Sequence, residues 1–330
     1  MAKLTPRRGM TSDQTERPEH NILVIKTGGI GSFVLALQAF AAIRMHHDQA
    51  EITLVTDQAV IDFATPAPFF DTVRAMPTNG AQFRALLNER PWQMVYDLEC
   101  SSATNSLFRS SLTWRQRFAR DTPVPWCGVA KGCVIPHTNP QRLAMHISER
   151  LMDQLSEAGI EARPPISLAW VSRAVGTFSL PISLSEPFVL IAIDPGGRDS
   201  AQWSPARCVE FAELVTARGH RAVLVGDHKM PSYTETLAER VPDAVDLCGQ
   251  ASYVEMVFLA WAALAAVGND SGLMHLIAAS GCRSIVLYDP GSDAALNGHQ
   301  GPDVTILRRH DLSAITAAEV MQRLSSEAVA

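Results

Sequence analysis

Short apolar runs alternate with amphipathic stretches over most of the chain. The runs are rich in Ile, Leu and Val, and we predict strands at residues 21–26, 51–56, 93–98, 188–193, 221–225, 265–268, 283–288 and 304–307. Between them, apolar residues recur at helical spacing, which predicts helices at 33–46, 81–90, 144–158, 205–218, 253–264, 271–280 and 317–325. Strands that alternate with helices are typical of parallel sheets covered on both faces. The pattern therefore predicts an α/β protein.

The alternation stops in the middle of the chain and then restarts. Residues 163–187 contain several prolines and a mixed composition, which is typical of a domain boundary. The length of 330 residues also favours two domains. We therefore predict a disordered tail at 1–20 and two α/β domains at 21–165 and 166–330. Residues 126–140 are rich in Gly and Pro and are predicted to form a loop.

Composition narrows the class of protein. The chain is 47% hydrophobic and has a formal net charge of −6, which excludes a disordered chain and disfavours a protein that coats nucleic acid. Its start is polar, and the longest apolar run, 256–267, is shorter than the ~18 residues that cross a bilayer. The six cysteines include no CxxC pair and no Cys/His cluster with zinc spacing. We predict a soluble cytoplasmic protein with reduced thiols and no metal site.

The first candidate binding loop follows the first predicted strand. Gly28, Gly29 and Gly31 stand between that strand and a helix, where glycine lets the backbone approach a ligand and a helix start attracts anions. One interpretation is dinucleotide binding by an oxidoreductase, with Asp57 on the ribose, although the glycines do not form a GxGxxG pattern. The alternative is a tight turn from strand to helix.

Two further loops occupy equivalent places in the second half of the chain. At 267–275, Asp270, Ser271 and Gly272 lie at the start of a predicted helix that carries His275, so its first N–H groups could bind a pyrophosphate. The alternative is a plain capping motif with a surface histidine. At 194–198, Gly196 and Gly197 precede Arg198, which is either a bidentate phosphate ligand or a solvated loop residue.

Four segments together resemble the ADP-heptose:lipopolysaccharide heptosyltransferases, glycosyltransferase family 9. The segments are ILVIKTGGIGSFVLALQAFAAIR, PGGRDSAQWSPARCVEFAELV, VDLCGQASYVEM and VGNDSGLMHLIAASGCRSIVLYDP. The resemblance implies a GT-B fold, in which two Rossmann-like domains with parallel sheets face each other across a cleft. It also implies inverting transfer of a heptose or related sugar from a nucleotide-sugar, typically ADP-linked. The C-terminal domain would hold this donor and the N-terminal domain a lipopolysaccharide-core or other glycan acceptor, without metal or cofactor.

The resemblance also assigns individual residues. On the donor side it implies Gly196, Gly197, Arg198, Trp203, Gly226, Asp227, Gln250, Asp270, Ser271, Gly272 and His275. On the acceptor side it implies the loop with Gly28, Gly29 and Gly31. Two positions depart from the family pattern: Ser32 stands where the family has its Asp base, and Ala201 or Gln202 where it has a Lys.

These departures leave several readings open. Arg198 or Arg207 could serve the phosphate, and Asp57, Asp97 or Glu99 could serve as the base. A different donor or acceptor is a second reading, and a catalytically degenerate protein that binds nucleotide-sugars or glycans is a third.

A basic segment with interleaved aromatic residues lies in the first half. Its basic residues are Arg109, Arg115, Arg117, Arg120 and Lys131. One interpretation is a docking surface for a phosphorylated glycolipid or for the cytoplasmic face of the membrane. The alternative is a solvated helix face.

Overall fold

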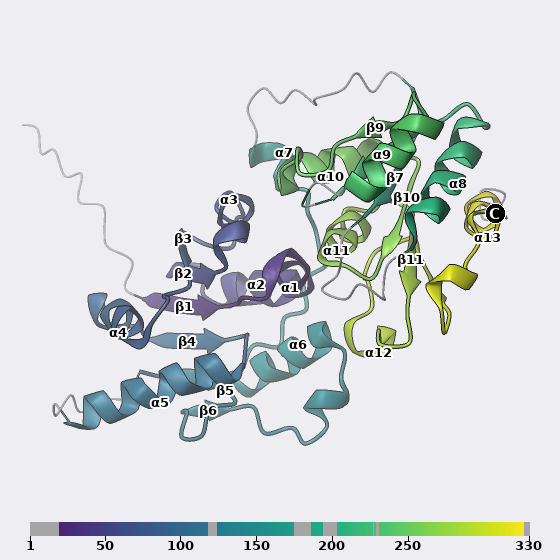
Figure 1. Ribbon diagram of the computed structural model, residues 1–330. Coiled ribbons are helices and arrows are strands. Elements are labelled where there is room, and N and C mark those ends of the chain that lie inside the picture. Colours follow the sequence, from purple (N-terminus) through teal and green to yellow (C-terminus); the bar gives the residue numbers. More distant parts are fainter. Residues whose placement is uncertain are drawn as a thin grey trace, which may run out of the picture.

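The computed structural model describes residues 20–117, 124–174, 186–193, 203–226, 228 and 231–326. The described part of the chain forms two α/β lobes (Figure 1). Each lobe is built around one sheet of six parallel strands. The prediction of an α/β protein is therefore confirmed. The sheets span residues 21–136 and 188–308, and the domain boundary at 165/166, which lies between them, stays a prediction.

The first sheet has the strand order β3-β2-β1-β4-β5-β6. Its strands are β1 (Asn21–Ile25), β2 (Glu51–Thr56), β3 (Thr72–Ala75), β4 (Met94–Asp97), β5 (Trp126–Gly128) and β6 (Ile135–Pro136). Its helices are α1 (Gly29–Leu35), α2 (Leu37–His46), α3 (Ile61–Ala64), α4 (Gly80–Glu89), α5 (Ser102–Arg117) and α6 (Ile147–Glu157), with short 3₁₀ turns at Gln58–Val60 and Arg142–Ala144. The strand order reverses between β1 and β4, which is where ligands bind in sheets of this kind.

The second sheet repeats this topology with the order β12-β11-β10-β7-β8-β9. Its strands are β7 (Phe188–Ala192), β8 (Arg221–Val225), β9 (Val245–Asp246), β10 (Ala265–Asn269), β11 (Ser284–Tyr288) and β12 (Val304–Arg308). The accompanying helices are α7 (Val171–Ala174), α8 (Pro205–Thr216), α9 (Pro231–Arg240), α10 (Tyr253–Ala262), α11 (Gly272–Ala279), α12 (Ala294–Asn297) and α13 (Ala317–Ser326), with a 3₁₀ turn at Leu312–Ala314. Here the order reverses between β7 and β10, so the end of β10 lies at the expected ligand position.

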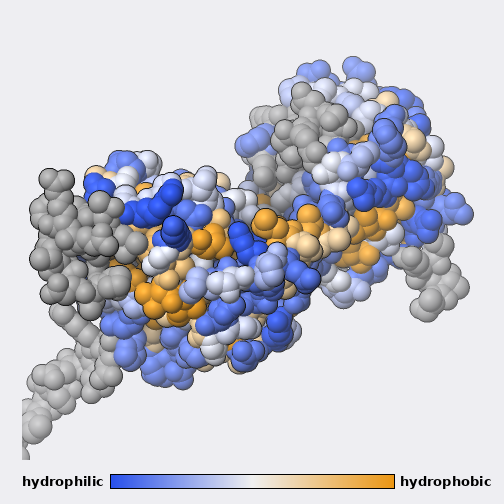
Figure 2. All heavy atoms as spheres, turned by 90° about the horizontal axis from the view of Figure 1, so that it is seen from below, coloured by the Kyte–Doolittle hydropathy of each residue, from blue (hydrophilic) through white to orange (hydrophobic). Residues whose placement is uncertain are grey.

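The lobes meet through α1 and α11, which lie side by side (Figure 1). Ile30 and Phe33 of α1 belong to the same buried apolar cluster as Leu273 and Met274 of α11. The backbones of the two helices approach each other so closely that a Cβ on Gly31 would lie 2.9 Å from the Gly272 Cα. Seen from below, apolar residues are visible near the join of the two lobes and also in patches on the face of each lobe, among hydrophilic residues (Figure 2). The contact between lobes is therefore a packed apolar interface.

Several elements differ from the sequence expectations. The predicted helix at 33–46 starts earlier and is divided into α1 and α2, whose axes differ by 51°. The loop predicted at 126–140 contains β5 and β6, because strands of three and two residues are too short to show alternation. No single helix in the described ranges is long and apolar enough to cross a bilayer; only α1 and α2 taken as a bent pair reach that length and composition.

Candidate functional site

The glycine loop after β1 is a turn held by a carboxylate. Gly28 and Gly29 have φ values of 95° and 75°, which favour glycine. The Asp57 Oδ2 accepts hydrogen bonds of 2.7 Å from both of their N–H groups. These N–H groups are therefore already paired with an anion of the chain itself. The dinucleotide interpretation placed Asp57 on the ribose of a bound nucleotide. It is wrong for this residue, because the Asp57 carboxylate is bonded to the glycine loop instead.

The other two carboxylates considered as bases, those of Glu99 and Asp97, are also held inside the N-terminal lobe. The Glu99 Oε2 accepts from the Lys26 Nζ at 2.8 Å and from the Thr27 N–H at 3.2 Å. Asp97 is fully buried, and burial raises the pKa of its carboxyl to about 6. Asp97 therefore lies in the core rather than at the cleft. Ser32, one turn into α1, packs its hydroxyl against Gly28.

The N-terminus of α11 carries the second candidate loop. Ser271 is its N-cap, and the Ser271 hydroxyl accepts a 3.3 Å bond from the Met274 N–H. The N–H groups of Gly272 and Leu273, the first two residues of the helix, have no acceptor within it. The Asp270 N–H donates to the Leu287 carbonyl and so ties the loop to the end of β11. Capping and an anion-ready helix start are thus both present.

A pocket of about 460 Å³ joins this helix start to the glycine loop. One wall consists of Gly28, Gly29, Ile30, Gly31, Ser32 and Leu35, and the other includes Asp270, Ser271, Gly272, His275, Ser292 and Asn297. Ile147 and Tyr253 complete the lining. The structure therefore brings Ser32 and the Asp270–Gly272 loop, which are far apart in sequence, into one cavity between the lobes.

A second pocket of about 500 Å³ shares Tyr253 with the first. Ala59, Asp62 and Phe63 line it from the N-terminal lobe, and His228, Gly249, Ala251, Ser252 and Val254 from the C-terminal lobe. Two predicted donor residues lie next to it. A Cβ on Gly226 would lie 2.3 Å from the Ile193 carbonyl oxygen, so only glycine fits there, and the Gln250 amide donates to the Asp246 carbonyl at 2.8 Å.

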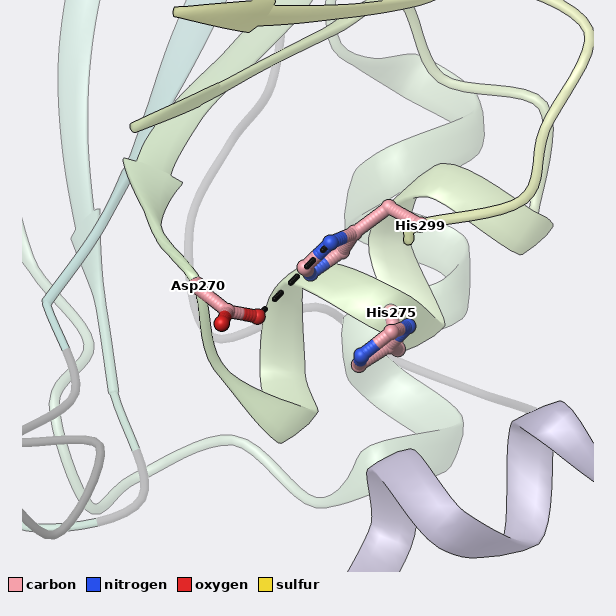
Figure 3. Close-up of side chains that lie close together, drawn as sticks. All are labelled: Asp270, His275 and His299. Atoms are coloured by element: carbon pink, nitrogen blue, oxygen red, sulfur yellow. Dashed lines mark ion pairs between the residues drawn. The ribbon is translucent and has the colours of Figure 1, made fainter. Parts of the chain in front are cut away.

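Three side chains gather beside the first pocket (Figure 3). The rings of His275 and His299 are stacked, with centroids 3.7 Å apart and an angle of 4° between their planes. The Asp270 Oδ1 lies 3.9 Å from the His299 Nδ1. Burial lowers the pKa of His299 to about 4 and that of His275 well below its ordinary value, so both imidazoles are neutral at pH 7. His275 is buried and so is not the surface histidine of the capping alternative.

Other predicted residues lie elsewhere. Trp203 is buried, and its indole N–H donates to the Ile315 carbonyl, so its side chain belongs to the core of the lobe instead of to either pocket lining. Arg207 pairs with Glu210 at 2.7 Å. Four donor-side predictions lie outside the described residues, as do both positions considered for the family Lys: Gly196, Gly197, Arg198 and Asp227, and Ala201 and Gln202.

The sequence reasoning missed two residues of the site. Tyr253 was assigned only to a helix, and it is the residue common to both pockets. His299 received no assignment, because a single histidine in an irregular stretch has no spacing signal. The basic segment is partly described: Arg109 lies on α5, whereas the side chains of Arg115 and Arg117 and the whole of Arg120 lie outside the described part.

Solved structures share the fold. E. coli ADP-heptose lps heptosyltransferase II superimposes with a TM-score of 0.68 at 19% identity, covering 93% of this chain and 98% of that one. The E. coli heptosyltransferase WaaC with ADP gives 0.71 at 18% identity, covering 92% and 98%. A glycosyl transferase family 9 protein from Veillonella parvula gives 0.72 at 15% identity, covering 93% and 96%. The predicted GT-B-like arrangement is confirmed.

Sequence comparison supplies the family. Lipooligosaccharide heptosyltransferase 2 of Haemophilus ducreyi is 22% identical over 306 residues, which cover 86% of this chain and 85% of that protein. The protein of the same name from Haemophilus influenzae is 31% identical over 110 residues, covering 31% of this chain and 32% of that relative. The sequence model described as "Glycosyltransferase family 9 (heptosyltransferase)" matches residues 150–317, slightly more than half of the chain. The chain belongs to glycosyltransferase family 9, the heptosyltransferase family.

Proposed function

We propose that this protein is an inverting glycosyltransferase that moves a heptose or a related sugar from an ADP-linked donor to a lipopolysaccharide-core or other glycan acceptor. The observation that carries the proposal is the pocket in which the N-terminus of α11 faces the glycine loop and Ser32 across the lobe interface. A helix N-terminus attracts a diphosphate, and an opposing wall from the other lobe leaves room for a second substrate.

The two adjoining pockets fit the two parts of a nucleotide-sugar. The diphosphate would accept hydrogen bonds from the Gly272 and Leu273 N–H groups, with the sugar beside Asp270. The nucleoside would extend past Tyr253 into the pocket with His228 and Gly249. The predicted donor contacts of Gly196, Gly197, Arg198 and Asp227 stay predictions. So does the expectation that transfer needs no metal.

Transfer makes two chemical demands. The acceptor hydroxyl oxygen bonds to the anomeric carbon while the bond from that carbon to the diphosphate oxygen breaks, and the diphosphate leaves with the electron pair. The hydroxyl proton must pass to a base. Ser32 is not a base at neutral pH, and Asp57 and Glu99 are each bonded to backbone N–H groups of the glycine loop.

This shortage of a base favours a second candidate function. A protein with the donor pocket but without an Asp at position 32 would bind nucleotide-sugars or glycans and turn over slowly or not at all. Loss of a general base typically costs about 10²–10⁴ in rate. The two candidates agree on donor binding and differ in turnover.

Donor binding is tested by calorimetric titration of ADP, GDP, UDP and dTDP and then of the corresponding sugars. We expect the ADP compounds to bind most tightly and Asp270→Ala to weaken binding of the ADP-sugar. Asp243→Ala, which removes an exposed carboxylate of the same lobe, is the control. Preference for another nucleotide contradicts the ADP assignment, and unchanged binding and turnover in Asp270→Ala remove that residue from the site.

Turnover separates the two candidates. Mass spectrometry of a glycan acceptor after incubation with the donor detects transfer. Ser32→Asp should raise the rate by about 10²–10⁴ if the wild-type chain lacks its base, with the uncharged Ser32→Asn as the matched control. Brisk wild-type turnover excludes the binding-protein reading, and silence of both wild type and Ser32→Asp argues against the transferase.

The proposed glycolipid acceptor determines where in the cell we expect the protein to work. We infer that the protein works in the cytoplasm, with peripheral contact to the membrane face through the basic segment that includes Arg109 and Lys131. A glycolipid acceptor would present its phosphates to such a surface. Sedimentation with vesicles containing anionic lipid, compared with neutral vesicles, tests this contact.

A further inference from the structure

A short segment of the C-terminal lobe is bonded to both lobes. It comprises residues 298–300, directly after α12, and is called the connecting segment below. Gly298 and Gln300 make hydrogen bonds with α6 and its N-cap in the N-terminal lobe, beside which α12 lies (Figure 1). Between them, His299 stacks on His275 of α11 (Figure 3). The connecting segment is therefore held on one side by the N-terminal lobe and on the other by the helix that begins at the proposed diphosphate site.

His146 joins the connecting segment to the N-terminal lobe. It is the N-cap of α6, and its Nδ1 accepts a 3.2 Å hydrogen bond from the Ser148 N–H. Its Nε2 lies 3.0 Å from the Gly298 carbonyl oxygen. A carbonyl oxygen only accepts, so the proton is on Nε2, and the lone pair of Nδ1 is left for the cap. A single tautomer of the imidazole thus makes both bonds.

Ser148 makes a second connection between the lobes. Its buried hydroxyl lies 2.9 Å from the Leu35 carbonyl oxygen and 2.9 Å from the side-chain amide oxygen of Gln300. The hydroxyl has one hydrogen to donate, and a half-turn of the amide would present an N–H group to it and satisfy both contacts. Leu35 is the last residue of α1 and lines the pocket between the lobes. The connecting segment is thereby linked to the wall that the N-terminal lobe contributes to this pocket.

His299 continues the connection to the start of α11. Its Nε2 donates to the Ser271 carbonyl oxygen at 3.3 Å, and its Nδ1 accepts from the Tyr288 hydroxyl at 2.7 Å. Ser271 is the N-cap of α11, and the same carbonyl accepts a 3.2 Å bond from the His275 N–H. A displacement of His299 therefore changes the hydrogen bonds of the residue that directly precedes Gly272, which lines the pocket.

We infer that the connecting segment positions the anion-binding start of α11 against the N-terminal lobe, with His146 and His299 as positioning residues for transfer. The connection runs from His146 through Gly298 and His299 to Ser271. Among the described residues, the lining of the pocket includes neither histidine, so both act through other residues. The effect on turnover rests on the proposed function, whereas the connection itself does not require a substrate.

Two substitutions at position 146 separate the connection from the helix cap. Asparagine keeps an oxygen near the position of Nδ1 and is a favoured N-cap, but it is too short to reach Gly298. Glutamine brings an amide N–H near the position of Nε2 and keeps the connection, but it gives up the cap. The exposed His46 of the same lobe provides the matched control, His46→Asn.

The first measurement is hydrogen–deuterium exchange, by mass spectrometry, of the peptide spanning residues 268–275 in the full-length protein without ligand. We expect His146→Asn to speed exchange of this peptide about threefold or more, because the start of α11 opens more often. His146→Gln and His46→Asn should exchange as the wild type does. His299→Phe, which keeps a ring for stacking and removes both hydrogen bonds, should also speed exchange.

The second measurement is kcat in the transfer assay. A misplacement of about 1 Å can cost up to about 10²-fold in rate, so we expect kcat to fall about tenfold in His146→Asn and to be restored in His146→Gln. Gln300→Ala breaks the second connection and leaves the Ser148 bond to the Leu35 carbonyl in place. It replaces His146→Asn in both measurements if that variant does not fold.

The outcomes distinguish this inference from the proposed function. Equal exchange at 268–275 in wild type, His146→Asn and Gln300→Ala overturns the connection. Faster exchange in His146→Gln than in His146→Asn overturns it as well, because the cap then decides the result. Unchanged kcat in a variant with faster exchange overturns the positioning role. Faster exchange in His146→Asn with no transfer by wild type keeps the connection and refutes the transferase, and transfer by wild type with unchanged exchange does the reverse.

Discussion

Gly31→Ala tests the packing that closes the site between the lobes. An alanine Cβ at this position would lie 2.9 Å from the Gly272 Cα and 3.1 Å from the His275 Cδ2. Carbon atoms in favourable contact are about 3.5–4.0 Å apart, so α1 and α11 must separate by roughly 0.6–1 Å. The nearest atom belongs to the backbone, so no side-chain rotation relieves the contact.

The energetic cost follows from two opposing effects. Overpacking of a tight contact costs about 1–3 kcal/mol. Alanine in place of glycine inside a helix returns about 1 kcal/mol. We therefore expect the free energy of unfolding to fall by up to about 2 kcal/mol. In a transferase, a displacement of about 1 Å between the donor wall and the acceptor wall would also lower kcat by up to about 10²-fold.

Urea unfolding followed by far-UV circular dichroism measures the stability, and the transfer assay measures kcat. Gly80→Ala is the control, because Gly80 begins α4 and its Cβ would meet only the end of Arg84 at 3.4 Å and the Ser110 hydroxyl at 3.9 Å. That variant should be unchanged or more stable by about 0.4–1 kcal/mol. A gain of about 1 kcal/mol in Gly31→Ala, which is expected of an unhindered glycine inside a helix, would refute the close approach of the two helices.

Three further variants test single interactions. Burial raises the pKa of Asp97 from 3.8 to about 6, so its buried charge destabilises the fold above that pH, and this group alone should contribute a gain of about 2 kcal/mol on going from pH 7 to pH 4. Protonation of His47 and His299, whose pKa values burial lowers to about 4, acts in the opposite direction, so the contribution of Asp97 is measured as the difference between wild type and Asp97→Asn. Asp97→Asn should lose this gain in urea unfolding at the two pH values; an identical pH slope would contradict it. Asp57→Ala leaves the Gly28 and Gly29 N–H groups without their acceptor and should lower stability by about 1–3 kcal/mol, again by urea unfolding, with no loss expected if water replaces the carboxylate fully. Ser271→Ala removes the cap of α11 and should cost about 1 kcal/mol in the same assay, while unchanged stability would show that the cap bond carries no weight.

The order and type of most elements could be predicted from the sequence. The predicted strands at 51–56 and 221–225 match β2 and β8 residue for residue, since apolar runs of this length in an α/β pattern are buried strands. The helix predicted at 271–280 matches α11 to within one residue at each end, and its cap is Ser271, one of the residues that favour a helix start. The helix α5 received no prediction, because its Ser- and Arg-rich sequence has no long apolar stripe.

Some features of the candidate site could likewise be predicted from the sequence, and others could not. Local sequence determined the α/β class, the glycine turn after β1 and the anion-ready start of α11, because spacing and capping depend on neighbouring residues. Tertiary structure alone decided that Asp57 bonds to the glycine loop, that His299 stacks on His275, and that Gly31 meets Gly272. Each of these contacts joins segments brought together only by packing of the sheets and lobes, and side-chain periodicity carries no information about such partners.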